Sequence, residues 1–108
     1  MIVSMKNIGK EASMATFNIT SAGEKHILVN HYDTIIAKGY IDSSDTLNGI
    51  AIYSSVASAS DVKAINEAFK GRAEVKVAKG KPMVKLVGKD KWEELAIDTN
   101  LDVFHIND

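Results

Sequence analysis

The chain has 108 residues, of which 45% are hydrophobic and 25% are charged, with one proline and a formal net charge of −1. These values are those of an ordinary globular domain, so the composition excludes wholesale disorder, collagen-like structure and a coiled coil. A chain of this length can bury one hydrophobic core but not two. Cysteine is absent, which excludes a disulfide framework and a thiolate metal site and favours a reducing compartment such as the cytoplasm.

The first clear structural pattern, an alternation of apolar and polar residues, begins only at Ala15. We therefore expect residues 1–14 to form a flexible arm and residues 15–108 to form a single α+β domain. The N-terminal stretch lacks the continuous apolar run of a signal peptide, and no later run is long enough to span a membrane. These features predict a cytoplasmic protein that has no membrane partner.

Four strands separated by short polar turns are predicted in the first half of the chain. They are expected at residues 15–20, 26–30, 34–41 and 47–53, from apolar and polar alternation or a short apolar run. In the third strand, the alternation places Ile35, Ala37, Gly39 and Ile41 on one face. Parallel neighbours need a crossover of a dozen or more residues, so these short turns predict a four-stranded antiparallel meander.

The pattern changes to a helical period after a serine-rich loop. Val62, Ile65 and Phe69 form one apolar stripe of a helix, for which Ser60 is the predicted N-cap and Gly71 the predicted stop. A hairpin is expected over residues 73–78 and 82–87, a short second helix over 90–96, and a terminal strand over 101–106. The predicted fold is thus α+β, an antiparallel β-sheet of the four-stranded meander plus a hairpin, packed with one main and one short helix.

The net charge conceals two segments of opposite sign. Residues 70–91 contain eight basic and two acidic residues, a net charge of +6, whereas residues 92–108 contain five acidic residues and neither lysine nor arginine. Lysines on the outer face of a hairpin can follow a phosphate backbone or hold a smaller anion. The candidate residues for such an anion or nucleic-acid site are Arg72, Lys76, Lys79, Lys81, Lys85, Lys89 and Lys91. A solvated edge that keeps the hairpin soluble explains the same residues more simply, because no aromatic side chains are interleaved for base stacking.

A second candidate surface combines the outer face of the meander with the acidic segment. If Ile36, Lys38 and Tyr40 share that face, it is half apolar, which suits a partner or a second copy of the chain. The competing expectation is that helices cover both faces of the sheet. Two interpretations of the acidic residues are open. They form either a carboxylate surface that competes for a partner's basic site or an ordinary solvated face. The candidate partner interface comprises Ile36, Lys38, Tyr40, Glu93, Glu94 and Asp98.

No catalytic, metal-binding or cofactor-binding residues are predicted. The chain has no nucleophile elbow and no phosphate-binding glycine loop. His26 is at an even-numbered position and His31 at an odd-numbered one. On one regular strand they would therefore face opposite sides of the sheet and not share a metal ion.

The leading hypothesis is therefore a small non-enzymatic accessory or regulatory protein that binds a macromolecule, in the first place a protein, with inhibition as one form of this activity. A homodimer is compatible with the same features. The alternative is nucleic-acid or anionic-ligand binding through residues 70–91, and a small enzyme is a distant third.

Overall fold

The computed structural model of the chain describes residues 2–53, 58–78, 81–99 and 103–107. These residues form ten strands and one helix: β1 (Ile2–Gly9), β2 (Ala12–Asn18), β3 (Lys25–His31), β4 (Thr34–Ile41), β5 (Leu47–Tyr53), α1 (Ala59–Ala68), β6 (Ala73–Ala78), β7 (Lys81–Leu86), β8 (Glu93–Glu94), β9 (Ala96–Asp98) and β10 (Val103–Asn107). Seven strands make one sheet in the order β1-β2-β3-β4-β5-β10-β9, and three make a second sheet in the order β6-β7-β8. The fold is therefore mostly antiparallel β-sheet with one helix.

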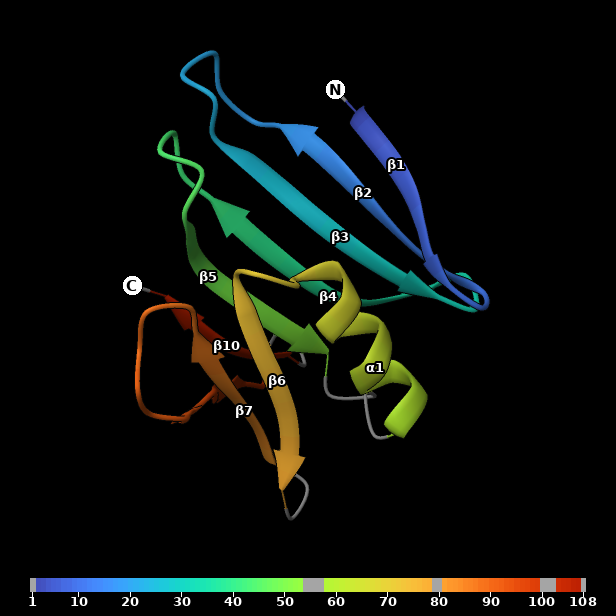
Figure 1. Cartoon of the computed structure of the whole chain (residues 1–108), viewed down its shortest axis with the longest axis vertical. Coiled ribbons are helices and arrows are strands. Elements are labelled where there is room, and N and C mark those ends of the chain that lie inside the picture. Colours follow the sequence, from blue (N-terminus) through green and yellow to red (C-terminus); the bar gives the residue numbers. More distant parts are fainter. Residues whose placement is uncertain (1, 54–57, 79–80, 100–102, 108) are drawn as a thin grey trace.

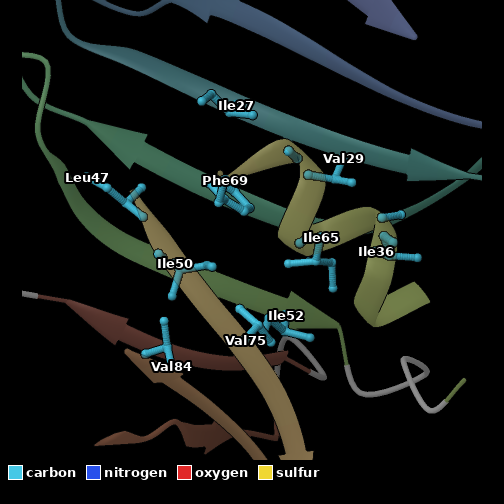
Figure 2. Packing of buried hydrophobic residues seen from close by; sticks show 14 of the residues in the cluster. Ile27, Val29, Ile36, Leu47, Ile50, Ile52, Ile65, Phe69, Val75 and Val84 are labelled. Atoms are coloured by element: carbon cyan, nitrogen blue, oxygen red, sulfur yellow. The ribbon is translucent and has the colours of Figure 1, made fainter. Parts of the chain in front are cut away.

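The molecule has two layers, and the larger sheet forms one of them. Helix α1 and the hairpin of β6 and β7 lie side by side against one face of this sheet, which we call the inner face (Figure 1). The hydrophobic core fills the space between the layers. Ile65 and Phe69 of α1 pack over the large sheet, and Val75 of β6 lies beside Ile52 of β5 (Figure 2). Val84 of β7 belongs to the same core.

The four predicted meander strands are present as β2 to β5, each antiparallel to its neighbour. The sheet is larger than predicted, because β1 adds a strand at one edge and β10 and β9 add two at the other. Residues 2–14, expected to form a flexible arm, instead make β1 and the first part of β2. Ile8 and Met14 pack against the core, and this burial stabilises a hairpin that the apolar spacing alone does not reveal.

A β-bulge in β4 breaks the predicted alternation of its side chains. Val29 of β3 pairs with Ala37, but the next residue, Asn30, pairs with Ile35, so Ile36 is the extra residue on β4. Such a bulge lets two successive side chains point to the same face. Ile36 and Ala37 are both buried in the core, whereas Ile35 is exposed. The expectation that Ile36 lies on the outer face is therefore wrong.

Helix α1 begins two residues before its predicted start and ends close to the predicted stop. Ser58, not Ser60, is the N-cap, and its hydroxyl accepts a hydrogen bond of 3.1 Å from the Asp61 amide. The helix is capped at its other end by Phe69, after which Gly71 adopts a left-handed φ of 84°. Phe69 is fully buried. Its ring occupies the space above Gly39 of β4, where a Cβ would lie only 2.4 Å from ring atom Cε1.

The predicted basic hairpin is present as β6 and β7, with valine and leucine side chains inward and Lys76 and Lys85 outward. The side chain of Asn66 in α1 ties β6 to the helix. Its Oδ1 accepts a bond of 2.7 Å from the Val75 amide, and its Nδ2 donates one of 2.9 Å to the Val75 carbonyl. Asn66 thus satisfies the backbone of a strand that lies at the edge of its sheet.

The short second helix predicted over residues 90–96 is wrong, because this segment is extended. Glu93 pairs with Val84 and Glu94 with Met83, while the Leu95 amide donates a 3.2 Å hydrogen bond to the carbonyl of Pro82. A helix of seven residues is marginal on its own, and the free edge of β7 offers backbone partners. Leu95 is buried in the extended segment, and an amphipathic helix would bury it too. Its apolar character therefore did not distinguish a strand from a helix.

Two further sequence predictions concern the terminal strand and membranes. A strand is present as β10, which pairs with β5, while residues 101 and 102 of the predicted range lie outside the described residues. Within the described chain, no helix combines the length and apolar character needed to cross a membrane.

Candidate functional site: the outer face of the large sheet

The face of the seven-stranded sheet that points away from α1 and the small sheet is called the outer face. The cross-strand register defines its central row, in which neighbouring residues share a face: Met5, Ala15, Leu28, Lys38, Ala51, His105 and Ala96. A second row contains Phe17, His26, Tyr40 and Gly49. Tyr53, Val103 and Asp98 continue the face toward its β9 edge.

No helix or strand in the described part of the chain packs against the outer face, because α1 and the small sheet both lie on the inner one. Large apolar and aromatic side chains on it are consequently only half-buried, among them Phe17, Leu28, Tyr40 and Tyr53. Antiparallel sheets often leave one face to water, but such a face is normally polar. The outer face is therefore more apolar than a sheet face that meets only water.

A hollow of about 290 Å³ lies near the middle of the outer face. Glycine and alanine form its floor at Gly39, Gly49 and Ala51, and larger side chains surround them at His26, Lys38, Tyr40 and His105. The hollow exists because β5 presents small residues between the bulky residues of β4 and β10. A concavity of this kind can receive one or two side chains of a bound protein, as the anchoring pockets of protein interfaces do.

Two of the side chains around the hollow, His26 and Tyr40, have shifted pKa values. Burial, and secondarily the positive charge of Lys38, lowers the pKa of His26, so this imidazole is neutral near pH 7. Its ring meets Tyr40 edge-on, with 6.0 Å between the centroids. Tyr40 donates a hydrogen bond to the Glu24 carboxylate, which raises the pKa of the phenol. With histidine counted as neutral, Lys38 is the one residue of the central row and the second row that carries a formal charge.

The structure brings together only part of the predicted partner interface. Lys38 and Tyr40 lie on the outer face, and Asp98 of β9 lies on the same face beside Val103. Ile36 lies in the core, as described above. Glu93 and Glu94 belong to β8 of the small sheet, in the other layer of the molecule.

The predicted cationic site is also divided by the fold. Arg72, Lys85 and Lys89 border adjoining hollows at one end of the small sheet. Lys76 is turned toward Trp92, with its Nζ 4.2 Å from the ring centroid. Lys81 and Lys91 are exposed elsewhere, and Lys79 lies outside the described residues.

A largely buried histidine–aspartate hydrogen bond that sequence reasoning missed joins β3 to α1. His31 is almost fully buried, and its Nδ1 lies 2.5 Å from Oδ1 of Asp61. His31 has the same parity as Ile27 and Val29, and this parity is the signal that predicts its burial; its partner is thirty positions away and has no sequence signature. The prediction that His26 and His31 face opposite sides of the sheet is confirmed. Among the described residues, no three ligand-type side chains converge as a metal site.

Comparison of the chain with protein-family models, with curated proteins and with solved structures gives no significant match.

Proposed function

We propose that this chain is a non-enzymatic accessory or regulatory protein that binds a protein partner through its outer face. The observation that supports this function is the uncovered apolar face itself, with a central hollow bordered by His26, Lys38, Tyr40 and His105. Interface cores are enriched in aromatic residues and methionine and depleted in charge. The central row and the second row of the outer face follow this trend, because they contain Met5, Phe17 and Tyr40 and a single lysine.

A protein partner fits this face better than a nucleic acid does. Phosphate backbones are bound by many lysines and arginines, whereas the central row and the second row of the outer face contain one lysine and no arginine. The histidine beside Lys38 is neutral near pH 7 because its pKa is lowered by burial and by that lysine. If the bases of a nucleic acid stacked on Tyr40 and Tyr53, its phosphates would lie on a surface with too few positive charges to neutralise them.

The dimensions of the face are those of a specific protein interface. Five strands of seven or eight residues and two shorter ones, about 4.8 Å apart and rising about 3.4 Å per residue, cover roughly 700 Å². This is close to the area that each partner buries in an interface of standard size. The expected partner presents apolar side chains that fill the hollow and a carboxylate that faces Lys38. Charge complementarity at this lysine then fixes the orientation of the complex.

The test is co-purification of the tagged full-length chain from its native host, with a matched pair of charge-reversal variants. Lys38→Glu changes the centre of the outer face, and Lys63→Glu makes the same change on the exposed surface of α1. The wild type and Lys63→Glu are expected to retain the same protein, which Lys38→Glu loses. Equal retention by both variants contradicts the proposal. If light scattering shows that the only complex formed contains two copies of the chain, the outer face is a dimer interface and not the binding site of a different protein.

A further inference from the structure

Two adjoining hollows lie where the turn between β4 and β5 meets the end of α1 and the small sheet. The first measures about 440 Å³ and the second about 230 Å³, and both are lined by Gly71, Arg72, Leu86, Val87 and Lys89. We call the two together the Arg72 hollow. It shares no residue with the outer face, so what it binds is independent of the function proposed above.

Arg72 is held in a fixed position at the centre of this hollow. Its Nη1 donates a 2.6 Å hydrogen bond to the backbone carbonyl of Asp45, and its Nη2 lies 3.1 Å from the Asp45 carboxylate. These contacts use two of the five N–H groups of the guanidinium. The two contacts orient the guanidinium, and its other N–H groups have no hydrogen-bond partner among the residues that the structure describes.

The turn that holds Arg72 is itself built by hydrogen bonds to Asp42. The carboxylate of Asp42 accepts bonds of 3.0 Å and 2.9 Å from the amides of Thr46 and Ser44, and these bonds lower its pKa. Asp45 adopts a left-handed φ of 64°, an uncommon conformation for a residue other than glycine. Strained backbone of this kind recurs at ligand clamps, where the surrounding structure maintains it.

The charges around the hollow are unbalanced in favour of an anion. Lys70, Arg72 and Lys89 line the first hollow together with one carboxylate, that of Asp45. Asp45 already pairs with Arg72, and neither Lys70 nor Lys89 forms an ion pair with any residue that the structure describes. Two cations therefore flank a guanidinium fork whose geometry matches the oxygens of a phosphate group.

A small phosphorylated molecule suits this arrangement better than a nucleic-acid backbone. A backbone needs a continuous cationic track, but the outward side of the β6–β7 hairpin interrupts its lysines with Glu74, which lies opposite Lys85, and with Met83, which lies opposite Lys76. Lys76 lies instead over the ring of Trp92. Leu47 and Leu86 provide apolar walls within the hollow, and its volume is typical of small-molecule sites.

We infer that the Arg72 hollow binds a small phosphate-bearing molecule, whose phosphoryl oxygens are held by Arg72, Lys70 and Lys89. The probe for this site is pyrophosphate, titrated calorimetrically into the full-length chain at low salt. Saturable binding is expected. Because one lost charge-assisted hydrogen bond weakens binding by about tenfold, the Lys70→Gln/Lys89→Gln double variant is expected to bind at least tenfold more weakly.

A matched control removes two exposed lysines that lie away from the hollow, in the Lys63→Gln/Lys81→Gln double variant, which is expected to keep the wild-type affinity. Because both double variants lower the net charge equally, a general electrostatic effect would weaken both alike and overturn the inference. Absence of saturable binding to the wild type would also overturn it. A third result would also overturn it: an oligothymidine that binds more tightly than pyrophosphate and whose binding both double variants weaken equally. That result would indicate that lysines spread over the surface bind a nucleic-acid backbone.

Discussion

Replacing Gly39 with alanine tests how α1 packs on the sheet. A Cβ at this position would lie 2.4 Å from Cε1 and 2.9 Å from Cζ of Phe69, and 3.0 Å from Cδ1 of Leu47. Carbon atoms in contact are normally about 3.5–4.0 Å apart, so the Phe69 ring has to move by about 1 Å. Phe69 is fully buried, and this movement disturbs the centre of the core.

The expected loss of stability follows from two opposing effects. Overpacking a well-packed core costs about 1–3 kcal/mol, and exchanging glycine for alanine restores about 0.4–1 kcal/mol by restricting the unfolded chain. The net loss in the free energy of unfolding is about 1–2 kcal/mol. For a chain of this length, that loss lowers the midpoint of thermal unfolding by about 4–9 °C.

The assay is urea and thermal unfolding monitored by circular dichroism, with Gly9→Ala as the matched control. A Cβ at Gly9 makes only an ordinary 3.8 Å contact with Ala12, so this variant should change stability by less than about 0.5 kcal/mol. Phe69→Leu removes the ring atoms that clash. The double variant Gly39→Ala/Phe69→Leu should therefore lose less stability than the sum of the single variants. Unchanged stability of Gly39→Ala, or strict additivity, would refute the described packing of Phe69.

Three other predictions concern polar side chains: two of them join α1 to neighbouring strands, and the third is a histidine with a lowered pKa. Asn66→Ala should lower the free energy of unfolding by about 2 kcal/mol in urea denaturation, since two hydrogen bonds to Val75 of about 1 kcal/mol each are lost; an effect below 0.5 kcal/mol would argue against this link. His31→Leu and Asp61→Ala should each cost about 1.5–3 kcal/mol, and their double variant should cost clearly less than the sum, whereas additive losses would exclude the pair. The pKa of His26 is lowered by burial and a nearby lysine, so its contribution to stability is complete above pH 6.5 and declines as the pH falls through the folded-state pKa. The stability difference between wild type and His26→Gln should shrink in that range, and a difference independent of pH would contradict the lowered pKa.

Short-range patterns predicted most of the strands and the helix. Alternation, or for β3 a short apolar run, located β2 to β5, and the apolar stripe of Val62, Ile65 and Phe69 located α1. Two features escaped these patterns because they depend on distant partners. β1 is stable as a strand because it pairs with β2 and packs Ile8 on the core, and residues 93–98 are extended because β7 and β10 offer backbone partners.

The candidate site was only partly predictable for the same reason. Parity placed Lys38 and Tyr40 on one face, but a single bulge in β4 moved Ile36 into the core. The hollow beside Tyr40 requires β10 to lie next to β5, which contributes His105 from the far end of the chain. Segment charge indicated the basic region. It could not show that Arg72 is held by Asp45, twenty-seven positions earlier.

Site-specific photo-crosslinking in the native host tests the outer face as a protein-binding surface most directly. A benzophenone amino acid in place of Tyr40 lies beside the central hollow, and the same amino acid in place of Lys63 lies on the exposed surface of α1. The account predicts one discrete adduct with a different protein from position 40 and none from position 63. No adduct from position 40, or the same adducts from both positions, would contradict the account.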